Sequence, residues 1–201
     1  ANASAGSSDT GISVAVHEPT GNVYVAGSVT RSGTGLDYYV QKIVPADLPS
    51  GWIRFYDGGA AGNTDIANAM TIDATGNVYV TGRSWGTGTD YDYVTIKYNS
   101  EGTQQWLARY NGSGNGTDMA AAIAVDSSGN VYVTGWSDHT PGTGIEYSIV
   151  TVKYSSSGTE QWAQGFGAYS DNMAYAIALD SSNNVYVTGK SVYGPSPATY
   201  D

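Results

Sequence analysis

A seven-residue stretch, GNVYVTG, occurs at residues 76–82 and again, unchanged, at 129–135. Near copies stand at residues 21–27 and 183–189. The four copies close on Gly27, Gly82, Gly135 and Gly189, at spacings of 55, 53 and 54 residues. A tandem repeat of about 50 residues that is carried by strand-like segments predicts a β-propeller or a β-solenoid before any other fold.

Residues 118–166 show the plan of one repeat. The strand-like segments AAIAVD, VYVTGW, YSIVTVKY and TEQWAQGF are joined by two tight turns, SSGN and SSSG, and by one longer loop. Gly and Asn favour such turns because they tolerate left-handed backbone angles. Four strands joined in this way predict an antiparallel meander, which is the blade of a β-propeller. The expected fold class is therefore all-β.

The Val-Tyr-Val strand inside the repeated stretch is apolar on both faces. In a propeller each sheet lies between two others, so its inner strands are covered on both sides. The first strand of each repeat is rich in Ala, as at Ala122 and Ala124, which suits a crowded position near the central axis. One blade cannot bury two faces alone, and this explains the repetition.

The predicted blades do not complete a ring. We expect a single partial propeller over residues 1–201, an arc of about three and a half blades. Its blades lie at residues 9–57, 64–111 and 117–167, with a half blade at 171–192. Propellers close with about four to eight blades. The sequence therefore predicts that the rest of the ring is supplied by further chain, or else by another subunit.

The charge and composition exclude several classes of function. The formal net charge is −10, so binding to a nucleic-acid backbone is not expected. Cysteine is absent, which excludes disulfides and thiolate metal sites. No apolar run approaches the length of a membrane span, so membrane insertion is not expected.

Some side chains recur at one position in three of the four repeats, and we interpret these as structural. Trp52, Trp106 and Trp162 recur in register, which favours a wedge between adjacent blades over stacking on sugars. Asp73, Asp126 and Asp180 stand at the first tight turn, where Asp commonly accepts hydrogen bonds from its own backbone.

Positions that differ between repeats are the better candidates for binding. The longer connections differ most, and in a meander they emerge on one face, called the loop-rich face below. Trp85, Trp136 and His139 lie at or next to one such connection in the second and third repeats. We treat these three residues as candidate ligand-binding positions, the alternative being ordinary loop residues.

Three carboxylates precede the Ala-rich first strands, at Asp65, Asp118 and Asp171. They are expected on the loop-rich face near the axis, where a ring of carboxylates could hold Ca²⁺. The sequence contains no continuous calcium-binding loop. The favoured interpretation is that these carboxylates form structural hydrogen bonds with the loop backbone. No other cofactor is expected.

Catalysis receives little support from the sequence. His17 and His139 are the two histidines, and no Ser-His-Asp arrangement can be assembled from the spacing. Paired carboxylates near the axis leave a glycan-cleaving hydrolase or lyase open as an alternative.

The segments DSSGNVYVTGWS, DYVTIKYNSEGTQQW and RYNGSGNGTDMAAAIAVD resemble the repeat of the bacterial seven-bladed β-propeller family. The resemblance extends from about residue 9 to residue 201, and the first repeat departs from it most. It implies a prokaryotic extracellular or cell-surface protein with seven blades in the complete ring. The family has no known catalytic residues that could be assigned to positions of this sequence. The function expected is a non-enzymatic scaffold or binding module for protein or glycan.

Overall fold

The computed structural model describes residues 9–45, 51–59, 63–138, 147–167 and 171–191. These residues form fourteen β-strands in four antiparallel sheets, and no helix occurs among them. The first sheet contains β1 (Thr10–His17), β2 (Asn22–Arg31), β3 (Gly35–Ile43) and β4 (Trp52–Tyr56). The second contains β5 (Ile66–Ile72), β6 (Val78–Trp85), β7 (Tyr91–Tyr98) and β8 (Gln104–Tyr110). The third contains β9 (Asp118–Val125), β10 (Val131–Asp138), β11 (Tyr147–Tyr154) and β12 (Glu160–Phe166). The last contains β13 (Met173–Leu179) and β14 (Val185–Lys190).

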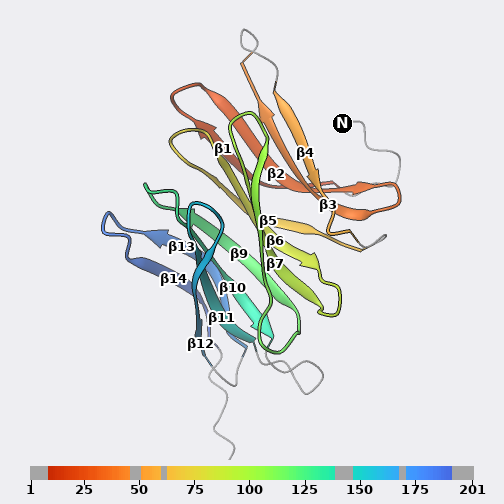
Figure 1. Ribbon diagram of the computed structural model, residues 1–201, viewed down its shortest axis with the longest axis vertical. Helices are drawn as coiled ribbons and strands as arrows, with labels where there is room; N and C mark the ends of the chain where they lie inside the picture. Colours follow the sequence, from red (N-terminus) through yellow and green to blue (C-terminus); the bar gives the residue numbers. More distant parts are fainter. Residues whose placement is uncertain (1–8, 46–50, 60–62, 139–146, 168–170, 192–201) are drawn as a thin grey trace, which may run out of the picture.

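The sheets are the blades of an open, incomplete propeller. In each sheet, strands that are consecutive in the chain are neighbours, as a meander requires. The first strand of each later blade contacts the first three strands of the blade before it. The sheets therefore follow one another in chain order (Figure 1), and β13–β14 forms the predicted half blade. The strands of the four sheets span residues 10–56, 66–110, 118–166 and 173–190.

The two hydrophobic cores lie between blades rather than inside one. One fills the space between blades 1 and 2, and the other lies between blades 2 and 3. Val78, Tyr79 and Val80 of blade 2 are fully buried, because a neighbouring sheet covers each face. In the half blade the corresponding Tyr186 and Val187 are exposed. The same sequence is thus buried or exposed according to the number of neighbours that its sheet has.

The glycine that ends each repeated stretch is required by a β-bulge. Opposite Gly82, the pairing register of β5 shifts between Ala67 and Ala69. The bulge brings the carbonyl oxygen of Ile66 to the place where a Cβ on Gly82 would lie. The other three blades show the same register shift and the same overlap, which explains why only glycine occurs here.

The repeated tryptophans connect neighbouring blades, as predicted. Trp52 Nε1 donates a hydrogen bond to the Ser100 carbonyl oxygen at 2.9 Å, in the second tight turn of blade 2. Its indole lies where a Cβ on Gly102 would otherwise stand. Trp106 makes the same contact with Ser156 of blade 3, at 3.0 Å. Both indoles therefore have a structural role, packing one blade against the next.

The turn carboxylates also have the structural role that was expected. Asp73 Oδ1 accepts hydrogen bonds from the backbone N–H groups of Thr75 and Asn77, and its Oδ2 accepts from Tyr79 Oη at 2.9 Å. Burial opposes ionisation of Asp73, but the hydrogen bonds from Asn77 and Thr75 outweigh it and lower the pKa. Asp126 and Asp180 make the corresponding bonds in their own turns.

Candidate functional site

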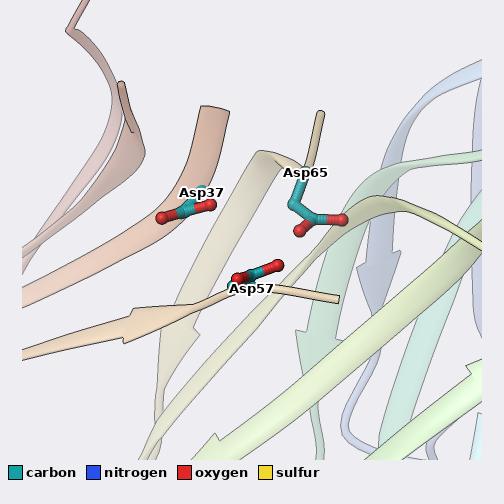
Figure 2. A group of neighbouring side chains, drawn as sticks. All are labelled: Asp37, Asp57 and Asp65. Carbon is teal, nitrogen blue, oxygen red and sulfur yellow. The ribbon is translucent and has the colours of Figure 1, made fainter. Parts of the chain in front are cut away.

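Three carboxylates from two blades meet on the loop-rich face, at the junction between blades 1 and 2. Asp37 lies at the start of β3, Asp57 follows β4, and Asp65 immediately precedes β5. One oxygen from each carboxylate lies within 4.8 Å of the others. Figure 2 shows the three side chains converging on a common space from three separate segments. We call this group the first-junction carboxylates.

Each of these carboxylates uses one oxygen in a hydrogen bond that holds it in place. Asp37 Oδ2 accepts from Thr34 Oγ1 at 2.8 Å. Asp65 Oδ2 accepts from the Gly58 N–H at 2.6 Å, and Asp57 Oδ1 accepts from the Gly59 N–H at 2.9 Å. The other oxygens of Asp37 and Asp65, both Oδ1, are buried and have no hydrogen-bond partner in the described part of the chain.

The charge at this junction is only partly compensated. The Arg31 guanidinium lies 3.3 Å from Asp37 Oδ2, but its side chain is 45% exposed, so water screens the pair. Burial raises the pKa of Asp37; the hydrogen bond from Thr34 opposes this rise, and the negative charge of Asp57 adds to it. The site therefore has an excess of negative charge in a partly desolvated setting.

The junction between blades 2 and 3 follows the same plan with different charges. Asp92 and Asp118 occupy the positions of Asp37 and Asp65, while Asn111 stands where blade 1 has Asp57. Arg109 lies 2.9 Å from Asp92 and also donates to Ser84. Burial raises the pKa of Asp118 to about 6, and the negative charge of Asp92 adds to the effect. The same guanidinium reaches toward blade 1, because its Nη2 also donates to Tyr56 Oη at 3.4 Å.

At the third junction the corresponding positions carry no carboxylate. The pairing of β13 with β14 places Asn172, not Asp171, in the position of Asp65 and Asp118. The expected alignment of Asp171 is therefore corrected by one residue. Asp171 instead forms an ion pair with Lys190 at 2.5 Å. The three predicted carboxylates thus lie at three separate junctions, and the structure does not bring them together.

The aromatic candidates have different environments. Trp85 ends β6, is 36% exposed, and meets the Tyr91 ring edge-on at a centroid distance of 5.1 Å. Trp136 is buried and packs on Tyr147 at 4.3 Å, so its ring is not available to a ligand in this arrangement. His139 lies outside the described residues.

Asp37 and Asp57 were not among the candidates from the sequence, although a signal for one of them is present. Asp37 and Asp92 recur at the start of the third strand, 55 residues apart, in LDYYV and YDYVT. That period matches the other repeated positions and could have singled them out. Asp57 has no such signal, because the next blade carries Asn111 in its place.

The arrangement favours holding a cation over acid–base catalysis. Glycoside hydrolases need two carboxylates that a sugar can reach. Asp37 and Asp65 are buried and tied to backbone or Thr34, so a substrate cannot approach them without opening of the junction. His17 is bonded on both ring nitrogens, to Thr20 and to the Ala74 carbonyl oxygen, in a turn on the opposite face. Neither group supports the glycan-cleaving alternative.

Among the described residues, no helix has the length and the apolar character needed to cross a membrane.

Part of the chain is similar to an uncharacterized WD repeat-containing protein, L264, of Acanthamoeba polyphaga mimivirus. The two are 29% identical over 126 residues, which is 52% of this chain and 9% of the viral protein. The chain thus corresponds to a small part of that relative.

A family model for a beta-propeller repeat, SBBP, matches residues 58–88, 105–143 and 161–191. The matched segments together make up about half of the chain and extend from the end of blade 1 into the half blade. The repeat period, the four-stranded sheets and the cores between blades agree with this match. The chain belongs to the SBBP beta-propeller repeat family.

Proposed function

We propose that this propeller is a non-enzymatic binding module of a prokaryotic cell surface or extracellular protein. Its loop-rich face would contact a protein or a glycan. The rigid blades hold the connecting loops, and binding residues are commonly carried by loops on such scaffolds. The location is inferred from the family resemblance alone.

One observation carries this proposal: an exposed aromatic group at the loop-rich end of blade 2. Trp85 and Tyr91 stand opposite each other at the ends of β6 and β7. The Arg83 guanidinium lies 4.7 Å from the centre of the Tyr91 ring, on the same end of the blade. Aromatic rings beside an arginine favour contacts with sugars and with peptide side chains.

The corresponding positions differ in the other blades. Thr30 takes the place of Trp85 in blade 1, and Asp138 takes it in blade 3. The fold therefore does not require an aromatic residue at this position. An exposed tryptophan that the fold does not require is well suited to recognise a ligand.

The test is binding of the full chain to a printed glycan array and to a peptide library, with the Trp85→Ala variant beside it. Trp162→Ala is the matched control, because Trp162 is 37% exposed but follows the second tight turn of blade 3, toward the opposite face. We expect Trp85→Ala to abolish the strongest signals and the control to keep them. Equal binding by both variants, or none by the parent chain, would count against the proposal.

We further propose that additional blades cover the two ends of the arc. Val14 and Val16 are exposed on the outer face of blade 1, and Tyr175 and Tyr186 are exposed on the half blade. Propeller sheets normally bury both faces against neighbours.

A cavity of about 590 Å³ lies between β12 and β14, lined by Trp162, Phe166 and Val187. In the preceding pair of blades, Trp106 packs on Tyr154 of a third strand. The cavity is therefore the expected place for a third strand of the half blade. Such strands would come from a longer chain or from another subunit.

Native mass spectrometry of the protein as its source organism makes it distinguishes these possibilities. A longer polypeptide or an oligomer is expected. A folded monomer at 21.0 kDa, the mass of this chain, would contradict the proposal.

A further inference from the structure

We propose that Asp37, Asp57 and Asp65 form a calcium-binding site that links blade 1 to blade 2 on the loop-rich face. This inference does not depend on the ligand of the propeller. It rests on the geometry of the three carboxylates, on their unpartnered oxygens and on the charge around them.

The spacing of the oxygens fits a calcium ion. Ca²⁺ binds carboxylate oxygens at about 2.3–2.6 Å, so two ligands on opposite sides of the ion lie at most about 5 Å apart. The first-junction carboxylates offer oxygens that all lie within 4.8 Å of one another. Water molecules would complete the six to eight ligands that Ca²⁺ commonly takes. Mg²⁺ demands shorter bonds and stricter geometry, so it would fit less well.

Two of the oxygens need a partner that the protein does not supply. Asp37 and Asp65 are 0% and 1% exposed, and their Oδ1 atoms accept no hydrogen bond from the described residues. A buried carboxylate oxygen without a partner is costly. These oxygens belong to two different blades, and a cation between them would satisfy both at once.

The charge leads to the same ion. Arg31 forms an ion pair with one of the three carboxylates, on the Oδ2 side of Asp37. Arg109 reaches toward this junction from blade 2 through hydrogen bonds to Tyr56 and Ser84, but its ion pair is with Asp92. The carboxylates therefore outnumber the guanidinium groups that pair with them, which favours a bound cation. At the next junction Asn111 replaces the third carboxylate.

The donor set consists of carboxylate oxygens. Oxygen ligands of this kind suit Ca²⁺, whereas zinc and copper sites in proteins favour histidine or cysteine. The overall charge of −10 also raises the local concentration of cations around the protein.

The experiment follows thermal unfolding and calcium calorimetry of the full chain after treatment with EDTA. With CaCl₂ at about 100 times the dissociation constant, we expect the Tm to rise by roughly 5–10 °C. Calorimetry should show one ion per chain. MgCl₂ at the same concentration should give a smaller shift.

Two variants locate the site. Asp57→Asn introduces the residue that blade 2 carries at this position, and Asp65→Asn introduces the residue of the third junction, Asn172. Each should weaken Ca²⁺ binding by about tenfold or more, since even outer-shell changes at metal sites have effects of that size. Asp90→Asn is the control, because it removes the same charge elsewhere on the loop-rich face.

The proposal fails if CaCl₂ leaves the Tm of the parent chain unchanged. It also fails if Asp57→Asn and Asp65→Asn, shown by circular dichroism to be folded, bind Ca²⁺ as tightly as Asp90→Asn. A loss of binding confined to the two site variants would support it.

Discussion

The first and second blade junctions have the same backbone plan but differ in one carboxylate and in the exposure of the arginine that pairs with the third strand. In both, a carboxylate at the start of a third strand lies near a carboxylate that precedes the next blade, and a glycine N–H holds the second of these. In blade 2 Arg109 pairs with Asp92 and its side chain is 29% exposed, whereas in blade 1 Arg31 pairs with Asp37 and is 45% exposed. The first junction has Phe55 at the position of Arg109 and adds Asp57.

This difference separates what the fold needs from what one blade adds. The glycine contact recurs at both junctions because it anchors the entry of the next blade. The charges vary because they do not determine the backbone. In each case an arginine pairs with the carboxylate of the third strand, and the first junction adds a third carboxylate, Asp57. A repeat protein can thus place a binding site in one junction without altering the others.

The largest effect is expected from removing Arg109, the arginine that pairs with Asp92. Arg109→Met leaves Asp92 buried beside Asp118 without its guanidinium, and it also removes hydrogen bonds to Ser84 and Tyr56. Loss of one partner from a buried pair typically costs about 3–5 kcal/mol. We expect a loss near the lower limit, since Arg109 is partly exposed. Urea unfolding at pH 7 measures it.

Arg31→Met is the matched variant at the first junction. Its side chain is more exposed, so its loss should cost less than about 1 kcal/mol. Equal losses of stability in the two variants would remove the distinction between the junctions.

The next largest effect is a pH dependence that belongs to Asp118. Burial raises the pKa of its carboxyl to about 6 in the folded state, above the usual value near 4 of an unfolded chain. Between these values the folded state holds a proton that the unfolded state releases. Stability therefore falls as the pH rises from about 4 to 6, by up to about 3 kcal/mol from this group.

Asp118→Asn should remove this dependence, and unfolding midpoints in urea at pH 4.5 and pH 7 would show the change. Asp126→Asn is a control, because the contribution of Asp126 to stability should change with pH in the opposite direction. Burial opposes ionisation of Asp126, but its hydrogen bonds, the largest of them from Asn130, lower the pKa, so its contribution to stability is lost as the pH falls. An unchanged slope in Asp118→Asn would show that other groups cause the dependence.

The blades could be predicted from the sequence because every local signal repeats. The Val-Tyr-Val strands, the glycine turns and the Trp residues recur at one period, and each contact between blades recurs with them. Position along the repeat therefore fixed which strands are buried. Blade 1 is predicted even though its turns differ, because its second strand retains the stretch at residues 21–27.

The site could be predicted only in part. Asp65 and Asp118 were placed correctly at blade entries, but their partners come from the preceding blade, some 28 residues earlier in the case of Asp37. A search within one repeat could not pair residues that meet only across a junction. The offset at Asp171 arose because Asp171 and Asn172 are adjacent, and strand pairing alone decides which of them takes the position.

A smaller effect, whose sign depends on calcium, is expected from Asp57→Asn. Without metal, the negative charge of Asp57 raises the pKa of Asp37, although burial contributes more. Removing that charge should stabilise the protein by less than about 1 kcal/mol in EDTA. With excess CaCl₂, the same variant should be less stable than the parent chain. Chemical unfolding in both buffers tests this reversal, and the same sign in both would contradict it.

The smallest effect is expected from Asn111→Asp, which gives the second junction the third carboxylate of the first. Asn111 is exposed, and its amide donates to Asn115 Oδ1, so the stability should change by no more than about 0.5 kcal/mol. Calorimetry with CaCl₂ should still find one ion per chain, because Arg109 remains beside Asp92. Adding Arg109→Phe, the residue of blade 1, should allow a second, weaker ion to bind. If Asn111→Asp alone created a second site, the guanidinium would not be what separates the two junctions, and the number of carboxylates would suffice.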